Sequence, residues 1–390
     1  MSPRASAPYA VQFGNGDIRI VGDGPPSFTI RVPNENALAR FLGADLYSAA
    51  MSFLGGDADI QGDLLSAVRM RLSLKENGWR RRLYKLAAGF APHRLEALFQ
   101  GRARAADNLR YHYDRSNRFF GQFLDSRMVY SCAYYRDFDQ TLDEAQLAKL
   151  DYVLRKLDVR AGERFLDIGC GWGALVERAA RGCGAIATGC TLSRQQYAQA
   201  RERMSGLHAA IHERDFRDLD GRFDKIASVG MFEHVGRRRL PEYFRSVYGM
   251  LEDDGLFLNH GIVRPETTSD DPSTLFIQRR VFPGGELPRL AQVICSAEKA
   301  GFEILDVENL RPHYARTCAE WVARLRQNRE ACLDIVGPET YRTWLLYLAG
   351  SAVNFERGVI EVHQILFAKR GTAHRRLTRE YMYSDSPPVG

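Results

Sequence analysis

The stretch "FLDIGCGWG", residues 165–173, constrains the fold of this chain more than any other segment. An apolar run ends near Asp167, and glycines follow at positions 169, 171 and 173. Glycine permits positive φ angles and lets a ligand approach the backbone closely. The stretch therefore predicts a strand that turns into a helix at the carboxyl edge of a parallel sheet, where open α/β folds bind ligands.

The second half of the chain alternates strand-like apolar runs with segments of helical apolar spacing. This order predicts a mainly parallel, Rossmann-like α/β sheet with helices on both faces, over residues 146–390. The segments expected to be strands are "RFLDIG", "AIATGCTL", "GLFLNHGI", "FEILDVENL" and "EVHQILFAKR", and a further strand is expected within "FDKIASVGMFEHV".

Two further regions precede this domain. Residues 1–70 carry short β-like pieces and a helical stretch, which predict a small α+β module. Residues 71–145 are expected to form a basic, mostly helical linker that covers the active site. From 69 to 104 there are ten Lys or Arg against two glutamates, interleaved with aromatic and leucine side chains. Such a segment suits an anionic membrane surface or a nucleic acid, and a plain solvated helix face is the alternative.

Composition excludes several classes of protein. No run approaches the roughly 20 apolar residues of a membrane span, and the N-terminus lacks a signal pattern, so we expect a cytoplasmic protein. The seven cysteines have irregular spacing without C-x-x-C, which argues against a disulfide framework or a structural zinc site. The nine histidines form no H-E-x-x-H pair, and we expect no metal site.

The glycine turn by itself leaves a dinucleotide site or an unliganded tight turn open. Its spacing is G-x-G-x-G rather than G-x-G-x-x-G, and Asp167 precedes the first glycine by two positions. A carboxylate here repels a pyrophosphate but suits a cationic cofactor such as S-adenosylmethionine (SAM). The second strand ends in "TGCTLSRQQ" without a carboxylate for a ribose, so Thr191, Ser193 and Gln196 are the nearest polar candidates.

Six motifs then occur in order: "HYDRSNRFF", "VYSCAYY", "LDIGCGWG", "VGMFEHVG", "NHGI" and "PHYARTCAEW". Together they resemble the cyclopropane-fatty-acid synthase family of SAM-dependent methyltransferases, which includes the mycolic acid cyclopropane synthases. The resemblance covers about 105–370 and, more weakly, the N-terminal region, which is a lipid-binding module in phospholipid-acting members. It implies methyl transfer from SAM to the double bond of an unsaturated fatty acyl chain in a phospholipid. A bound bicarbonate would take the proton whose loss closes the cyclopropane ring.

The resemblance also assigns residues. The bicarbonate would be held by the backbone amide of Cys132, by Glu233, His260 and Tyr314, and by the backbone of Ile262. SAM would be held by Tyr130, Ser131, Asp167, Gly169, Gly171, Thr191, Leu192, Gln196 and Phe216. Phe216 would stack on the adenine, Asp215 is a structural or adenine-binding alternative, and His234 and His313 are left outside the site.

Structural readings of the same residues stay open. Cys132 fits a small buried hydrophobe, and His260 fits a hydrogen-bonded residue at a strand end. The aromatic side chains of 111–135 would wall an acyl channel or belong to the core. The sequence has Arg115 and Ser116 where many cyclopropane synthases have a small residue and glycine.

Several alternatives for the function remain. Close relatives methylate an unsaturated chain and leave a methylene or a methyl branch, sometimes with a separate reductase. A nucleic-acid methyltransferase and a non-catalytic lipid carrier are remote, and no nucleic acid partner is expected. We expect peripheral association with the inner membrane face through the basic 69–104 segment, and family members are often homodimers.

Overall fold

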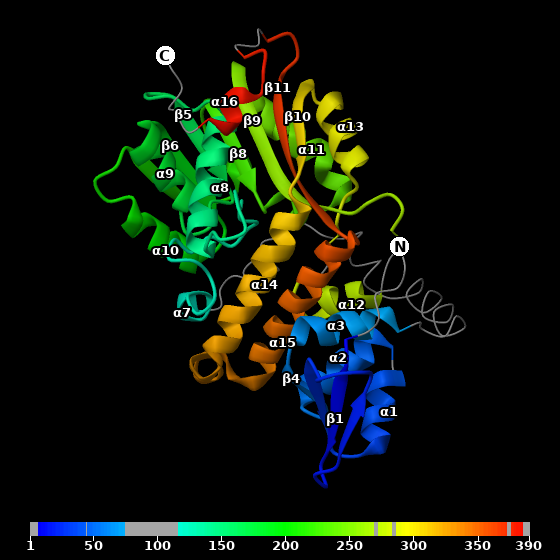
Figure 1. Ribbon diagram of the computed structural model, residues 1–390. Coiled ribbons are helices and arrows are strands. Elements are labelled where there is room, and N and C mark those ends of the chain that lie inside the picture. The colour runs from blue at the N-terminus through cyan, green and yellow to red at the C-terminus, as the bar shows by residue number, and fades with distance from the viewer. Residues whose placement is uncertain are drawn as a thin grey trace.

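The computed structural model describes residues 7–43, 45–74, 116–268, 272–282, 286–372 and 376–384. Its strands form a seven-stranded sheet and a four-stranded sheet, and two long helices run between the parts that contain them (Figure 1). Within the described residues, no helix combines the length and the apolar character that a membrane span requires.

The large sheet confirms the predicted α/β architecture. Its strand order is β10-β11-β9-β8-β5-β6-β7, and β11 runs antiparallel to both of its neighbours while the other pairs are parallel. β5 lies between β6 and β8, so the strand order reverses beside it, which places the glycine turn at the switch point of the sheet. The strands are β5 (Arg164–Ile168), β6 (Ile186–Thr191), β7 (Ala209–Glu213), β8 (Phe223–Val229), β9 (Leu251–Val263), β10 (Phe302–Asn309) and β11 (Glu361–Lys369).

Helices cover both faces of this sheet. Successive residues of a strand point to opposite faces, so neighbours in β5 pack against different helices. Phe165 packs in the core formed with α8 (Leu142–Lys156) and α9 (Ala174–Cys183). The next residue, Leu166, packs in the core formed with α11 (Leu240–Met250) and α13 (Leu290–Lys299). α10 (Arg194–Arg203) lies on the α9 side, and α16 (Glu380–Tyr383) packs on α8.

Residues 7–73 form the expected α+β module, with the exception of the unplaced position 44. Its sheet has the order β2-β1-β3-β4, where β1 is Tyr9–Phe13, β2 Ile18–Val21, β3 Phe28–Val32 and β4 Asp59–Gly62. Three helices accompany it: α1 (Glu35–Gly43), α2 (Leu46–Gly55) and α3 (Leu64–Ser73). Asp45 and Asp63 begin α2 and α3, because each carboxylate accepts a backbone N–H three residues ahead, at 2.9 and 3.1 Å.

Two long helices connect the module to the large sheet (Figure 1). α14 (Arg311–Gln327) and α15 (Arg329–Arg357) pack side by side, and α15 also packs on α2 and α3. Gly337 interrupts α15 with φ 73° immediately before Pro338, which gives the helix its kink. α12 (Pro272–Arg280) packs on α2, so the second half of the chain contacts the module from two elements.

The segment before α8 differs from its prediction. After α7 (Asn117–Phe120), residues 121–141 form turns and extended loop instead of the mostly helical structure that we expected. Trp172 holds α7, which precedes this loop: its indole N–H donates to Asn117 at 2.9 Å, and its ring lies 5.2 Å from that of Phe120. Residues 75–115, which include most of the basic 69–104 segment, lie outside the described residues.

Candidate active site

The three glycines of the turn serve different purposes. Gly169, Gly171 and Gly173 all have positive φ angles, of 79°, 55° and 81°. A Cβ at Gly169 would lie 2.7 Å from the Met231 side chain, whereas one at Gly171 would meet nothing within 4 Å. Gly169 is therefore needed for packing against the loop after β8, and Gly171 leaves open space in front of the backbone.

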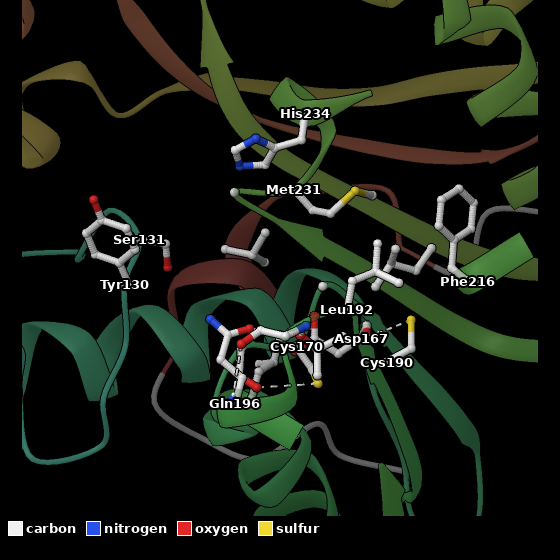
Figure 2. A pocket seen from close by; sticks show the side chains of 18 of the residues that line it. Tyr130, Ser131, Asp167, Cys170, Cys190, Leu192, Gln196, Phe216, Met231 and His234 are labelled. Carbon is white, nitrogen blue, oxygen red and sulfur yellow. Dashed lines mark hydrogen bonds between the residues drawn. The ribbon is translucent and has the colours of Figure 1, made fainter. Parts of the chain in front are cut away.

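That open space is a cavity at the carboxyl edge of β5 and β6. Figure 2 shows Tyr130 and Ser131 at one end, Phe216 at the opposite end, and Asp167 and Leu192 between them. The cavity is thus elongated, with a polar end and an aromatic end, as a nucleoside joined to an amino acid requires. All nine residues predicted to bind the cofactor line it: Tyr130, Ser131, Asp167, Gly169, Gly171, Thr191, Leu192, Gln196 and Phe216.

Asp167 is a buried acid in the floor of this cavity. It is 3% exposed, and its Oδ1 has no hydrogen-bond partner among the described residues. Burial raises its pKa to about 7, against the lowering effect of the Lys149 charge. A buried carboxyl oxygen without a partner is costly in an empty cavity, so Asp167 fits a cationic or hydrogen-donating ligand.

The end of β6 carries no acidic residue that could bind a ribose, and neutral polar side chains lie there instead. The Thr191 hydroxyl donates to Oε1 of Gln196 at 2.8 Å, and the backbone N–H of Ser193 donates to the same hydroxyl at 3.2 Å. These bonds fix the Gln196 amide and leave its nitrogen as a donor for a ligand in the cavity. Neutral groups thus stand where a ribose would be held.

Phe216 lies in the short 3₁₀ helix η1 (Phe216–Asp218), which Asp215 begins. Its ring is buried edge-on against Tyr243, with centroids 5.8 Å apart. The Asp215 carboxylate accepts the Arg217 backbone N–H at 3.0 Å and also binds the Arg217 guanidinium. These contacts support the structural reading of Asp215.

A second set of buried polar residues, outside the cofactor cavity, begins with Glu233, where η2 (Phe232–His234) meets β9. Glu233 accepts the Ile262 backbone N–H on Oε1 at 2.7 Å, while its buried Oε2 has no partner among the described residues. A Cβ at Gly261 would overlap the Phe232 ring, so glycine allows this close approach. Burial raises the pKa of Glu233 to about 7. The Ile262 amide therefore holds Glu233, and its contact with bicarbonate stays a prediction.

His260 lies inside β9, three residues before its end, as the predicted strand "GLFLNHGI" has it, and the alternative reading as a strand-end residue is wrong. It is 1% exposed, and burial lowers its pKa well below the usual value, so the ring is neutral. The Gln364 amide nitrogen lies 3.0 Å from Nδ1, and with the amide in this orientation Nδ1 accepts and the ring proton is on Nε2. Nε2 has no partner among the described residues and is available as a donor.

Cys132 and Tyr314 complete the predicted set. The Cys132 side chain is fully buried, burial raises its thiol pKa well above the usual value, and its backbone amide has no hydrogen bond with the described residues. Tyr314 lies in the first turn of α14, stacked 4.5 Å from Phe355. Burial and neighbours that include Cys132 and Glu233 raise its pKa well above the usual value. A protonated phenol and a free amide are both donors.

The lining residues that the sequence analysis did not assign to the site include Lys149, Met231 and His234, the last of which it had set outside the site. Lys149 lies on an amphipathic helix, where a lysine indicates a solvated face, so no local signal marks it. His234 lines the cavity, and burial lowers its pKa to about 4. His313, which the sequence analysis left outside the site, accepts the Tyr135 N–H at 3.1 Å and stacks on Tyr134 at 4.9 Å.

Comparisons with known proteins agree with this geometry. Residues 100–365 match the family model described as mycolic acid cyclopropane synthetase. A Pseudomonas putida protein named "Probable fatty acid methyltransferase" is 40% identical over 92% of each chain. Cyclopropane mycolic acid synthase 3 of Mycobacterium tuberculosis is 36% identical, over 67% of this chain and 96% of the relative.

Solved structures give the same result. The cyclopropane synthase MmaA2 from Mycobacterium tuberculosis superposes with a TM-score of 0.66 at 33% identity, covering 68% of this chain and 98% of that one. The mycolic acid cyclopropane synthase CmaA1, complexed with SAH and CTAB, gives a TM-score of 0.65 at 35% identity, again over 68% and 98%. The chain therefore belongs to the mycolic acid cyclopropane synthetase family of SAM-dependent methyltransferases.

Proposed function

We propose that the protein methylates the double bond of an unsaturated fatty acyl chain in a phospholipid and closes a cyclopropane ring with the help of bicarbonate. A group of three buried polar atoms without partners among the described residues carries this proposal. They are Oε2 of Glu233, Nε2 of His260 and the backbone amide of Cys132. Their residues are linked in the fold, because His260 lies two residues before Ile262, which binds Glu233, and because Cys132 and Glu233 both act on the pKa of Tyr314. Buried polar groups are normally paired, so this group fits a small polar ligand.

The cofactor cavity supports SAM as the methyl donor. When bound, SAM supplies an electrophilic methyl group, and its transfer to an alkene leaves positive charge on the neighbouring carbon. Asp167 faces the cationic amino-acid end, Gln196 offers an amide donor, and Phe216 offers an aromatic face at the other end. The solved relative CmaA1 was crystallised with SAH.

The polar group suits a bicarbonate, which when bound supplies a base for the proton lost on ring closure. His260 and Tyr314 donate hydrogen bonds, the Cys132 amide adds a third donor, and Glu233 accepts the hydroxyl hydrogen. Because these groups are buried, water is excluded and their dipoles act in a medium of low dielectric constant. The protonated Cys132 thiol does not compete as a nucleophile.

A second, almost entirely apolar cavity supports an acyl substrate. It lies between the N-terminal module and helices α12 and α15, with lining residues that include Phe41, Phe53, Phe276 and Tyr347. Tyr130 and the charge of Glu233 both affect the pKa of Tyr347, so Tyr347 lies between this cavity and the site. An apolar chain that enters here would reach the polar group.

The reaction is proposed to take place at an anionic membrane surface, to which the protein binds. The basic residues of 69–104 would each add about 1 kcal/mol of attraction to anionic lipids. We expect binding to phosphatidylglycerol vesicles to weaken as the salt concentration rises from 0.05 to about 0.5 M, because salt screens exposed charges. Vesicle sedimentation measures this, and binding that does not change with salt would remove the electrostatic part of the proposal.

The product of the reaction tests the function. The protein is incubated with methyl-labelled SAM and vesicles of a monounsaturated phospholipid, and the product is identified by mass and NMR. Cyclopropane methylene signals are expected. A methyl branch or an exocyclic methylene would instead support the related C-methyltransferase, which the fatty acid methyltransferase relative favours, and no labelled lipid would overturn both.

A further inference from the structure

Lys149 is a buried cation in the wall of the cofactor cavity. It lies on α8, is 2% exposed, and lines the cavity together with Ser131 and Asp167. Its Nζ donates to the Ser131 hydroxyl oxygen at 2.9 Å and forms no ion pair with any residue that the structure describes. Lys156, the last residue of the same helix, pairs with Asp306 and Glu308.

The contrast between these two lysines is informative. A buried ammonium is costly unless an anion accompanies it. Lys156 has its anions within the protein, whereas Lys149 has only a neutral hydroxyl, although the carboxylates of Asp125 and Asp167 are near enough to affect its pKa. The remaining ammonium hydrogens of Lys149 are therefore suited to an anion that enters the cavity.

The hydrogen bond also sets the direction of the Ser131 hydroxyl. Because its oxygen accepts from Lys149, its own hydrogen must go to a different acceptor. No described residue accepts it, and Ser131 lines the cavity. The same loop is fixed by Gln146, one turn before Lys149, which donates to the Ser131 carbonyl at 2.9 Å. Ser131 is thus a positioned donor that faces the cavity.

Two features therefore lie at this end of the cavity. The Ser131 hydroxyl is a donor oriented by the Lys149 ammonium, and Asp167 is an acid whose Oδ1 has no partner among the described residues. This arrangement matches the two charges of an amino acid, a carboxylate and an ammonium. We propose that Lys149 is the positioning residue that, through Ser131, lets the cavity bind the α-carboxylate of the methionyl end of the cofactor. The inference rests on the proposed use of SAM.

The test compares two ligands by titration calorimetry: S-adenosylhomocysteine and its decarboxylated analogue, which lacks only the α-carboxylate. The wild-type protein should prefer S-adenosylhomocysteine by roughly 10–100-fold, because hydrogen bonds to charged groups are strong. Lys149→Met should lose most of this preference by weakening S-adenosylhomocysteine, while the affinity for the decarboxylated analogue changes by less than about threefold.

Ser131→Ala is the second variant. It removes the hydroxyl through which Lys149 would act, and it removes a much smaller part of a side chain than a substitution of Lys149 does. It should lose the same preference, and adding Lys149→Met to it should have little further effect, since the two residues act as one unit. Lys156→Met is the matched control: it removes a paired lysine from the same helix, and the ligand preference should stay as in the wild type.

The outcomes separate this inference from the proposed function. A wild-type protein that does not bind S-adenosylhomocysteine would contradict the use of SAM itself. If the wild type binds it but Lys149→Met and Ser131→Ala keep the preference, the inference about Lys149 is wrong. Equal weakening of both ligands in the two variants would also overturn it, because that result indicates a purely structural role.

Discussion

At the scale of single residues, the site is marked by atoms that the fold leaves without partners. Glu233 shows this most clearly, because Oε1 accepts the Ile262 amide while the buried Oε2 has no partner among the described residues. The two ring nitrogens of His260 differ in the same way: Nδ1 lies near the Gln364 amide, and Nε2 has no partner among the described residues. Each side chain is thus oriented by one atom and offers the other to a ligand.

The buried carboxyl of Glu233 makes stability depend on pH. A carboxyl whose pKa is raised in the folded state stabilises the fold fully below its unfolded value of 4.5, and this contribution is lost as the pH rises through about 7. The free energy of unfolding should therefore fall between about pH 4.5 and pH 7, on the order of 3 kcal/mol for a fully buried group. Glu233→Gln should remove this part of the slope in urea unfolding of the ligand-free protein.

Asp167 contributes a slope of the same sign in both proteins, so the difference between wild type and variant isolates Glu233. Glu298→Gln, on an exposed position of α13, is the control and should leave the slope unchanged. An unchanged pH slope in Glu233→Gln would show that the carboxyl is not buried as the structure has it.

The residue roles divide into those that sequence could reveal and those that it could not. The nine residues predicted to bind the cofactor come from ordered motifs, and all of them line one cavity; that they bind the cofactor stays a prediction. Lys149 and His234 were missed because burial depends on packing between distant segments, which no local pattern reports. The alternative reading of His260 as a strand-end residue is wrong, because β9 continues to Val263 through its pairing with β11, which lies far along the chain.

At the scale of helices and strands, the close contact of η2 with β9 positions Glu233. Gly261 allows it, because a Cβ there would overlap the Phe232 ring and lie 3.2 Å from the Glu233 carboxyl carbon. The strands of the large sheet were predicted well because continuous apolar runs are a strong signal. The edge strand β7 and helix α2 were missed, since their short patterns depend on packing partners.

Gly261→Ala should disrupt this contact. Overpacking of a tight site costs about 1–3 kcal/mol, and the displaced Glu233 should lower turnover strongly while S-adenosylhomocysteine still binds. Gly249→Ala on the exposed face of α11 is the matched control, because its Cβ would meet nothing within 4 Å. That control should be neutral or stabilising by up to about 1 kcal/mol. Thermal unfolding and product assays measure both, and full activity in Gly261→Ala would contradict the role of this contact.

At the scale of the whole molecule, the module and the catalytic part share one core. Phe53 of the module, Phe120 of α7 and Trp344 of α15 belong to the same buried cluster. The sequence indicated separate regions because composition changes along the chain. It could not show that α15, late in the sequence, returns to pack on α2 and α3 of the module (Figure 1).

Arg342 is a polar link in this shared interface. It donates to the Phe53 carbonyl at 2.7 Å, pairs with Asp59 at 3.6 Å and lies over the Phe53 ring. Arg342→Met should reduce the free energy of unfolding by about 1–3 kcal/mol and leave the affinity for S-adenosylhomocysteine unchanged. Urea unfolding and calorimetry check this. Arg329→Met, which removes an exposed pair with Glu330, should cost less than about 0.5 kcal/mol. Equal effects of the two variants would contradict a specific link.

The dependence of turnover on bicarbonate tests the central claim most directly. The cyclopropane product is measured in buffer depleted of carbon dioxide and again after bicarbonate is added, for the wild type and for Glu233→Gln. We predict that depletion lowers the wild-type rate by roughly 10²-fold, that bicarbonate restores it, and that the variant binds S-adenosylhomocysteine but is not restored. A wild-type rate that does not depend on bicarbonate, or a fully active Glu233→Gln, would contradict the account.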